Sequence, residues 1–371
     1  MEDVVTLPTR PRGTAPMKVL LTGVDGYVGS VLAPMLLQRG YDVTGLDTGY
    51  YRAGWLFHDA KDRPNILTRD IRHITVQDLE GFDAVIHLAE LSNDPLGEHD
   101  PEKTYAINHR GSVALAEKAK AAGVTRFVYA SSCSVYGAAG DDAKTELSPV
   151  NPQTAYAHCK VFVERDVQPL ADANFAPTFL RNATAFGASP RMRFDIVLNN
   201  LAGLAWTTGK IAMSSDGSPW RPLVHVEDMC GAMIAVLESP RESVSNQIFN
   251  VGDERNIYRV RDIAEAVAEA FPNCKVEFGK SNGDNRSYRV SFEKIKRDLP
   301  NFRCRWDARS GAWQLRALFE RIGMTEQVFQ APPFTRLKQL LHLVRTKQLN
   351  SNFYWQADEL SQDDASRRVH R

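Results

Sequence analysis

Thr22-Gly23-Val24-Asp25-Gly26-Tyr27-Val28-Gly29 is the stretch that decides the fold, because it joins a short apolar run at 18–21 to a helical pattern at about 28–39. The apolar run is typical of a buried strand. Glycines in such a turn allow a tight bend and a close approach of the backbone to a diphosphate. Free N–H groups at the start of the helix can then bind phosphate oxygens. The stretch therefore predicts a dinucleotide-binding turn, with cofactor contacts from Gly23, Asp25, Gly26, Tyr27, Val28 and Gly29.

Strand and helix patterns alternate after this turn, which separates it from an ordinary glycine turn. Apolar runs recur in the first half of the chain, at 43–46, 84–88, 127–130 and 178–180. Helical patterns lie between them, at 112–122 and 154–167. Strands that alternate with helices form right-handed βαβ units and a parallel sheet. We therefore expect an α/β protein in which residues 17–185 form a Rossmann-type, doubly wound parallel sheet that binds the cofactor.

The identity of the dinucleotide depends on Asp47, which ends the second predicted strand 18 residues beyond Gly29. A carboxylate at that place can bond both hydroxyls of a ribose, and it repels a 2′-phosphate. NAD is therefore preferred over NADP, although Arg52 close by would suit the extra phosphate. Asp70 and Ile71 have two interpretations, a cap on the adenine or part of a solvated charged loop.

The regular alternation of strand and helix patterns ends after about residue 185. Segments become less regular there, with helical stretches at 227–238 and 260–271. This pattern indicates a smaller, C-terminal substrate-binding lobe over 186–330, packed at the carboxyl edge of the sheet. The chain could later cross back from this lobe to the Rossmann-type domain. A C-terminal extension at 331–357 has no assignable role, and the polar stretches 1–16 and 358–371 predict disordered tails.

Composition excludes several classes of function. Lys+Arg and Asp+Glu both number 45 in 371 residues, so the net charge is +0. Without an overall positive field, nucleic acid and anionic membranes are not expected as partners. Five widely spaced cysteines without a CxxC pair disfavour a zinc site or a disulfide framework. No stretch reaches membrane-spanning length. We expect a cytoplasmic protein without a metal ion.

A second motif, Tyr156-Ala157-His158-Cys159-Lys160, carries the chemistry. Residues at i and i+4 share one face of a helix. A lysine cation near a phenol lowers the pKa of the tyrosine, so Tyr156 becomes a candidate general base. The motif also follows Ser132, which lies just after the predicted strand at 127–130. Alone, such a pair is usually only a solvated helix face, and the preceding nucleotide motif is what favours catalysis.

Together these motifs resemble the extended short-chain dehydrogenase/reductase family, and within it the nucleotide-sugar epimerases and dehydratases. The resemblance covers roughly residues 17–300. Further matches are His87-Leu88-Ala89, Asn108, Arg221 with Val226-Glu227-Asp228, and Phe249-Asn250-Val251-Gly252.

The resemblance implies a role for each matching residue. Tyr156 takes the proton of a sugar hydroxyl, Lys160 holds the nicotinamide ribose, and Ser132 bonds the same hydroxyl. The cofactor is NAD, with further contacts from Leu88, Ala89 and Asn108. Arg221 and Arg286 match arginines that grip the substrate diphosphate, and the alternative for each is an ordinary surface arginine. A nucleotide-diphosphate sugar is the expected substrate, and a homodimer is the expected assembly.

Departures from the family pattern bear on the reaction. Sugar 4,6-dehydratases carry Asp-Glu directly after the catalytic Ser or Thr, whereas this chain has Cys133 and Ser134, so 4,6-dehydration is disfavoured. Cys133 resembles a cysteine of UDP-apiose/UDP-xylose synthases that sits by the reacting sugar, and a buried inert thiol is the alternative. Thr184 replaces a usual asparagine, for which Asn182, Asn199 and Asn200 are candidate substitutes.

The leading functional hypothesis is an NAD-dependent nucleotide-sugar epimerase that works through a transient keto-sugar, with oxidation at C4. A sugar-nucleotide reductase, dehydrogenase or decarboxylase could use the same tyrosine and lysine. A non-enzymatic NAD-binding protein is the alternative from another class, and the presence of both Tyr156 and Lys160 argues against it.

Overall fold

The computed structural model describes residues 15–58, 63–92, 95, 100–138, 142–213, 215–280 and 287–356. Arg286, the predicted C-terminal tail at 358–371, and the predicted N-terminal tail up to residue 14 lie outside the described residues.

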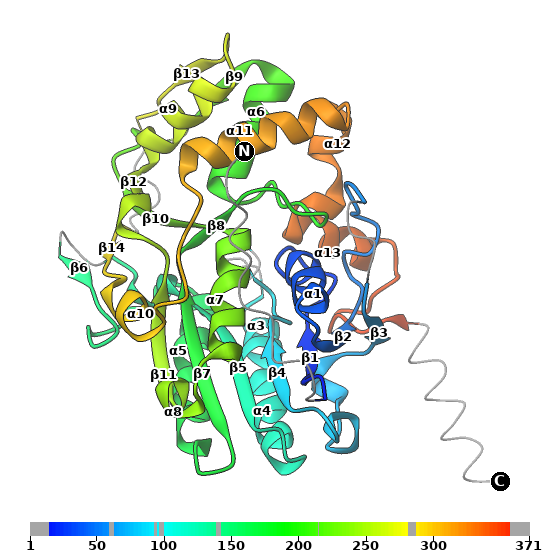
Figure 1. Ribbon diagram of the computed structural model, residues 1–371. Helices are drawn as coiled ribbons and strands as arrows, with labels where there is room; N and C mark the ends of the chain where they lie inside the picture. The colour runs from blue at the N-terminus through cyan, green and yellow to red at the C-terminus, as the bar shows by residue number, and fades with distance from the viewer. Residues whose placement is uncertain are drawn as a thin grey trace.

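The centre of the protein is a seven-stranded, fully parallel sheet with the strand order β11-β7-β5-β4-β1-β2-β3 (Figure 1). This order places crossovers on both sides of β1, so the predicted Rossmann-type, doubly wound sheet is confirmed. Its strands are β1 (Lys18–Thr22), β2 (Asp42–Asp47), β3 (Asn65–Thr68), β4 (Ala84–His87), β5 (Arg126–Ser132), β7 (Ala176–Asn182) and β11 (Gln247–Val251).

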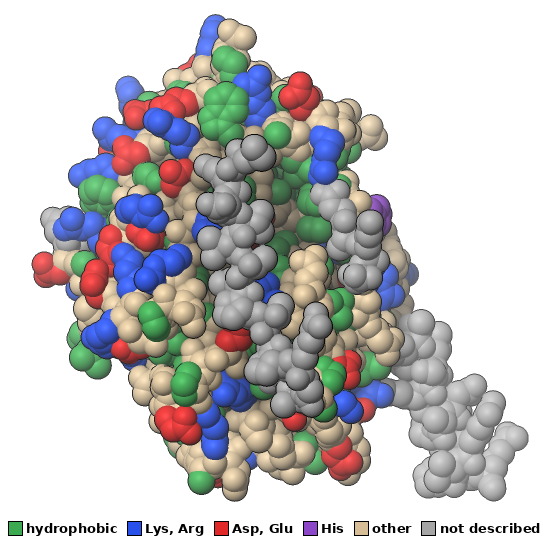
Figure 2. Space-filling model, viewed as in Figure 1, with side chains coloured by type: hydrophobic (Ala, Val, Ile, Leu, Met, Phe, Trp, Pro, Cys, Tyr) green, Lys and Arg blue, Asp and Glu red, His purple; other side chains and the backbone are tan. Residues whose placement is uncertain are grey.

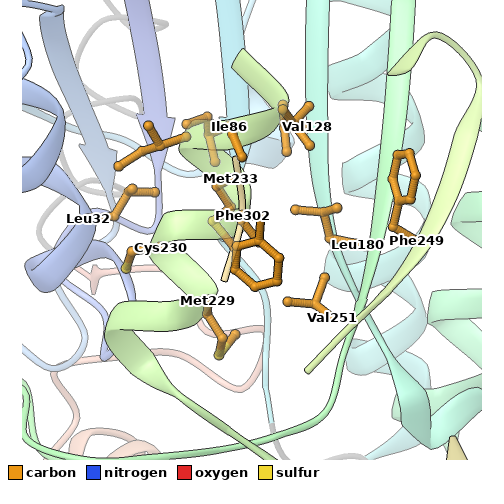
Figure 3. Packing of buried hydrophobic residues seen from close by; sticks show 14 of the residues in the cluster. Leu32, Ile86, Val128, Leu180, Met229, Cys230, Met233, Phe249, Val251 and Phe302 are labelled. Atoms are coloured by element: carbon orange, nitrogen blue, oxygen red, sulfur yellow. The ribbon is translucent and has the colours of Figure 1, made fainter. Parts of the chain in front are cut away.

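Helices cover both faces of the sheet with two separate hydrophobic clusters. On one face, α1 (Gly29–Gln38) and α7 (Val226–Glu238) share a cluster with the strands. Figure 3 shows Met229 and Met233 of α7 against Ile86, Val128 and Leu180 of the sheet. On the other face lie α4 (Ser112–Ala121) and α5 (Ala155–Val167). The short helix α3 (Pro101–Thr104) and the π-helix η3 (Tyr105–Gly111) precede α4.

A second, smaller lobe lies beyond the carboxyl ends of the strands and has its own hydrophobic cluster. Its long helices are α6 (Val197–Thr208), α9 (Val260–Ala270) and α11 (Ala308–Arg321). Two small sheets accompany them, β12-β10-β8 and β13-β9. Their strands are β8 (Thr184–Phe186), β9 (Lys210–Ala212), β10 (Trp220–His225), β12 (Ile257–Arg259) and β13 (Lys275–Glu277).

The boundary predicted at residue 185 does not divide the two parts cleanly, because the chain returns to the large sheet. Helix α7 packs on that sheet, and β11 is its edge strand beside β7. Helix α10 (Glu293–Asp298) also contributes Ile295 to the cluster on the sheet. The remaining pair of strands is β6 (Ala143–Lys144) with β14 (Arg289–Val290).

The region 331–356 folds back onto the cofactor half of the protein. It contains η7 (Pro332–Phe334) and α13 (Arg336–Arg345), and Leu340 and Leu343 of α13 share a hydrophobic cluster with Tyr50 and Ile71. The other short helices are η1 (Ile71–His73), η2 (Gln77–Leu79), η4 (Cys133–Tyr136), η5 (Gln168–Leu170), α8 (Arg241–Val244), η6 (Glu254–Asn256) and α12 (Glu326–Gln330).

The surface charges, the cysteines and the helices can be compared with the expectations on nucleic acid, disulfides, membranes and metal ions. Figure 2 shows Lys and Arg interspersed with Asp and Glu on the face it displays. All five cysteines are free thiols. Within the described ranges, no helix is both long enough and apolar enough to cross a membrane. The same residues contain no group of three or more His, Cys, Asp or Glu side chains that could hold a metal ion.

Candidate active site

A cavity of about 880 Å³ opens where the carboxyl ends of the strands meet the smaller lobe. Its walls come from the glycine turn after β1, the ends of β2, β4, β5 and β7, the first turn of α5, and strands β8 and β10. In open α/β sheets, ligands bind in this crevice outside the carboxyl ends of the strands.

The glycine turn needs its glycines for steric reasons. Gly23 has a φ of +74°, and a Cβ added there would lie 2.8 Å from the backbone N of Ala89. A Cβ on Gly29 would lie 2.2 Å from the carbonyl oxygen of Gly23. All the predicted contact residues of the turn except Asp25 line the cavity: Gly23, Gly26, Tyr27, Val28 and Gly29.

Asp47 lies in the cavity wall, and Asp25 does not. The Asp47 carboxylate accepts hydrogen bonds from the backbone N–H groups of Asp25 at 3.1 Å and Gly49 at 2.7 Å. Burial raises the pKa of Asp47 to about 6, more than these hydrogen bonds lower it. The Asp25 carboxylate instead pairs with Arg63 at 2.8 Å and Arg191 at 3.4 Å. The predicted contact of Asp25 with the cofactor is therefore not supported. The backbone N–H of Asp25 orients Asp47, and its carboxylate pairs with the two arginines.

Apart from Tyr156 and Lys160, four of the other residues predicted to contact the cofactor line the cavity and one does not. Asp70, Ile71, Leu88 and Ala89 line the cavity. Asp70 caps η1 and pairs with Arg72 at 2.6 Å, whereas the side chain of Ile71 is buried. Asn108 is fully buried and bonds the backbone N–H and C=O of Leu91, at 2.8 and 2.9 Å. It lies outside the cavity lining, so it supports the loop after β4.

Tyr156 and Lys160 lie one turn apart near the start of α5, whose Thr154 caps the helix through the N–H of Ala157. Both line the cavity, with the Lys160 ammonium 5.3 Å from the centre of the Tyr156 ring. Lys160 is buried and donates to the carbonyl of Ala130 and to the carboxylate of Glu90. Burial alone would lower the pKa of Lys160, but Glu90 and Tyr156 together raise it, so the ammonium stays charged.

Glu90 is a residue that the sequence analysis missed. Its side chain is 3% exposed, lines the cavity, and also accepts a hydrogen bond from the Tyr129 hydroxyl at 2.6 Å. The available signal was its position, because a carboxylate directly after His87-Leu88-Ala89 must emerge at the carboxyl end of β4. The lysine of the motif is therefore part of a buried ion pair.

The opposite part of the cavity holds several predicted substrate residues. Asn182 bonds two main-chain carbonyls through Nδ2, while its buried Oδ1 has no hydrogen-bond partner among the residues that the structure describes. Ser132 accepts from the N–H of Ser134 at 3.1 Å, which leaves its own hydroxyl proton to donate. The cavity lining on this side includes Ser132, Asn182, Thr184, Asn200, Arg221 and Tyr288.

Two predicted site residues turn away from the cavity. Cys133 is fully buried in the cluster beneath the sheet, donates to the carbonyl of Arg181 at 3.1 Å, and has a pKa raised by burial. The structure therefore gives no support to the chemical role considered for Cys133, and the burial agrees with the alternative, an inert buried thiol. Asn199 joins the main chain of Gly187 and Arg193, at 3.0 and 3.1 Å, while its neighbour Asn200 lines the cavity.

Comparison with known proteins identifies the family. Residues 19–252 match the model of the NAD dependent epimerase/dehydratase family. The chain belongs to this family. Its cofactor is accordingly NAD, and the glycine turn, which has no room for side chains at Gly23 and Gly29, fits a dinucleotide.

Curated relatives and solved structures agree with this family membership. The chain is 30% identical over 303 residues to a UDP-glucose 4-epimerase of Corynebacterium glutamicum, with 76% of this chain and 90% of that protein covered. The structure of MoeE5 in complex with UDP-glucose and NAD is 26% identical, with a TM-score of 0.70, and covers 82% of this chain and 99% of that one. The dTDP-glucose 4,6-dehydratase DesIV of Streptomyces venezuelae shares the fold at 23% identity, with a TM-score of 0.74 and coverage of 84% and 100%.

The raised pKa of Asp47 predicts pH-dependent binding of NAD by this family member. Ribose hydroxyls donate to an ionised carboxylate, so affinity should be highest above a pH of about 6 and should fall as the pH drops through that value. Asp47→Asn should remove this dependence and the preference for NAD over NADP, whereas the exposed Asp42→Asn on the same strand should not. Calorimetric titrations at several pH values test this, and equal or tighter binding of NADP by the wild type contradicts it.

Proposed function

We propose that the protein is an NAD-dependent nucleotide-sugar epimerase that works through a transient keto-sugar, with C4 as the reacting carbon. The observation that carries the proposal is the meeting of Tyr156, Lys160 and Ser132 in one cavity with the glycine turn. The similarity to a UDP-glucose 4-epimerase over most of both chains supports the same activity.

The side chains of the cavity have distinct tasks in this reaction. The Tyr156 phenolate, favoured by the nearby Lys160 cation, accepts the proton of the sugar hydroxyl, and Ser132 donates a hydrogen bond to the same oxygen. Lys160 uses one ammonium proton for Ala130 and one for Glu90, so a third is available for the ribose beside Tyr156. Bound NAD supplies reversible redox chemistry at the sugar carbon. The vacant Oδ1 of Asn182 is suited to accept a hydrogen bond from another sugar hydroxyl.

The arrangement also supports epimerisation over dehydration. Dehydration needs an acid and a base beside the sugar, and the two positions after Ser132 provide none, since Cys133 is buried in the core and Ser134 is a hydroxyl. Two of the carboxylates that line the cavity, Glu90 and Asp195, are each paired with a cation, Lys160 and Arg193. Both carboxylates are therefore already engaged with a cation.

The proposal is tested by incubating the protein and NAD with UDP-glucose or UDP-galactose, and then with a panel of other nucleotide sugars, followed by NMR. We expect one pair of epimers to reach the same equilibrium from either side, with deuterium at the reacting carbon retained. Accumulation of NADH indicates a dehydrogenase, and release of carbon dioxide from UDP-glucuronate indicates a decarboxylase; either result overturns the proposal. Sedimentation of the same sample tests the homodimer, which stays a prediction.

A further inference from the structure

Three buried arginines surround the cofactor end of the cavity, and they differ in their partners. Arg191 pairs with Asp25, and Arg193 pairs with Asp195 at 2.9 Å. Arg336 makes no ion pair with any carboxylate in the described part of the chain. Its guanidinium reaches only the carbonyls of Pro333 and Arg191, each at 3.5 Å, the long limit for a hydrogen bond.

The surroundings of Arg336 make its lack of a counter-ion notable. Its side chain is 3% exposed, lies over the Tyr51 ring at 4.0 Å, and lines the cavity. Burial and the nearby Arg193 lower the pKa of Arg336 to about 10. The carboxylates of Asp195 and Asp47 are near enough to act on the guanidinium, but within the described residues neither forms a direct ion pair with it. Burial of a cation without a direct ion pair is unfavourable. A protein that retains one in a ligand cavity has a place for an anion that arrives with the ligand.

The position of Arg336 identifies that anion. The guanidinium contacts the carbonyl of Arg191, whose own side chain pairs with Asp25 of the glycine turn. Besides Arg193, Tyr51 and Asp195, the nearby groups that act on it electrostatically include Asp47 at the end of β2. The glycine turn is where the backbone meets a dinucleotide diphosphate, and Asp47 is placed for the adjoining ribose. Arg221 and Tyr288, in contrast, belong to the strands and loops of the substrate side.

The chain holds Arg336 there through several contacts. Arg336 begins α13, and its backbone N–H donates to Asp195 at 3.2 Å. One turn later, Gln339 donates to the carbonyl of Tyr50 at 3.0 Å, which fixes the helix on the loop after β2. Figure 1 shows α13 near the end of β2, which is far from it in sequence. Farther along the chain, Trp355 donates to the carbonyl of Thr48 at 2.7 Å.

We propose that Arg336 binds the diphosphate of the NAD cofactor, so that residues 331–356 form a working wall of the cofactor site. This segment lies outside residues 19–252, which match the family model. The inference rests on the NAD dependence of the family and is independent of which sugar reacts. A nucleotide sugar also carries a diphosphate, and the experiment separates the two sources.

The test measures binding to Arg336→Met by calorimetry, with Lys338→Met as the control. Lys338 is an exposed cation on the same helix, so both variants lose one charge from α13. Loss of a buried, charge-assisted contact should weaken NAD and ADP-ribose by at least roughly 30-fold. Binding of UDP should be unchanged, and so should binding of adenosine, measured by NMR. Thermal unfolding without ligands should show Arg336→Met to be at least as stable as the wild type, because it removes a buried charge that has no direct ion pair.

The other outcomes overturn the inference in distinguishable ways. Unchanged NAD affinity, with the wild type binding NAD normally, removes Arg336 from the cofactor site and leaves the proposed epimerase reaction intact. Weaker UDP binding with normal NAD binding assigns Arg336 to the substrate diphosphate. An equal loss for adenosine and ADP-ribose means that the substitution disturbs the whole pocket. A wild-type protein that binds no NAD would instead refute the proposed function.

Discussion

Tyr156→Phe should fold and bind NAD as the wild type does, yet lose roughly 10²–10⁴-fold in kcat. The substitution keeps the aromatic ring and removes only the hydroxyl that takes the substrate proton. Tyr156 lines the cavity on the first turn of α5, near the buried Lys160 ammonium, and the phenylalanine ring can keep the same place in the cavity wall. Steady-state turnover followed by NMR, together with calorimetric binding of NAD, measures the two properties separately.

Tyr105→Phe is the matched control for this experiment. Tyr105 lies in the π-helix η3, stacks on Phe162 at a ring separation of 6.2 Å, and does not line the cavity. Its turnover should equal that of the wild type. Turnover near the wild-type value in Tyr156→Phe, or a loss of equal size in Tyr105→Phe, would refute the assignment of Tyr156 as the base.

The strands that the sequence predicts are those buried on both faces. The runs at 18–21, 43–46, 84–88, 127–130 and 178–180 all correspond to strands of the large sheet, because central parallel strands are continuously apolar. Strand β3 gave no such signal, since it lies at the edge of the sheet and three of its four residues are exposed. Its pairing with β2 is visible only in the structure.

The helix at 227–238 was predictable, and its location was not. Most residues of α7 are buried, and apolar side chains occur on all sides of the helix. Because no single face of the helix is apolar, the periodicity of the sequence does not show which surface the helix packs against. The return of the chain to the large sheet through α7 and β11 is a property of the tertiary structure. A boundary at 185 therefore describes the sheet only together with the later crossing back of the chain, which the sequence allows but does not locate.

Some residues of the candidate site are predictable from short sequence motifs, whereas others are recognisable only from contacts in the folded structure. Tyr156, Lys160 and Asp47 follow from spacing within one motif or one strand, and all three line the cavity. Glu90 and Arg336 are recognised as site residues only from contacts with residues far away in the sequence. Glu90 pairs with Lys160, 70 residues away, and Arg336 contacts the carbonyl of Arg191, 145 residues away. A short motif contains no trace of such distant partners.

Four other predictions placed a polar or sulfur-containing residue in the site because it adjoins a motif: Asp25, Asn108, Cys133 and Asn199. None of the four lines the cavity, and the side chain of each instead contacts main chain or a salt-bridge partner. Small polar side chains hydrogen-bond nearby main chain as readily as a ligand, and sequence alone does not distinguish the two uses. The direction of the side chain decides, as the opposite fates of Asn199 and Asn200 show.

The ion pair between Lys160 and Glu90 should make each residue costly to remove alone. Both side chains are almost fully buried, at 4% and 3% exposure. Removing one partner leaves the other charge buried without compensation, which typically costs about 3–5 kcal/mol in the free energy of unfolding. We therefore expect Lys160→Met and Glu90→Leu each to lose stability on this scale in urea titrations. The surface pair Arg110–Glu102 is the control, because Arg110→Met should change stability by less than about 1 kcal/mol.

The double variant Lys160→Met/Glu90→Leu separates stability from catalysis. Apolar residues in place of a buried ion pair are often neutral or stabilising, so the double variant should recover most of the stability that either single variant loses. Its activity should stay low, because no ammonium remains beside Tyr156. The residual activity of both variants that lack Lys160 should shift to higher pH, since a phenolate without a nearby cation forms less readily. Single variants as stable as the wild type, or a double variant that regains activity together with stability, would show that the ion pair has neither role.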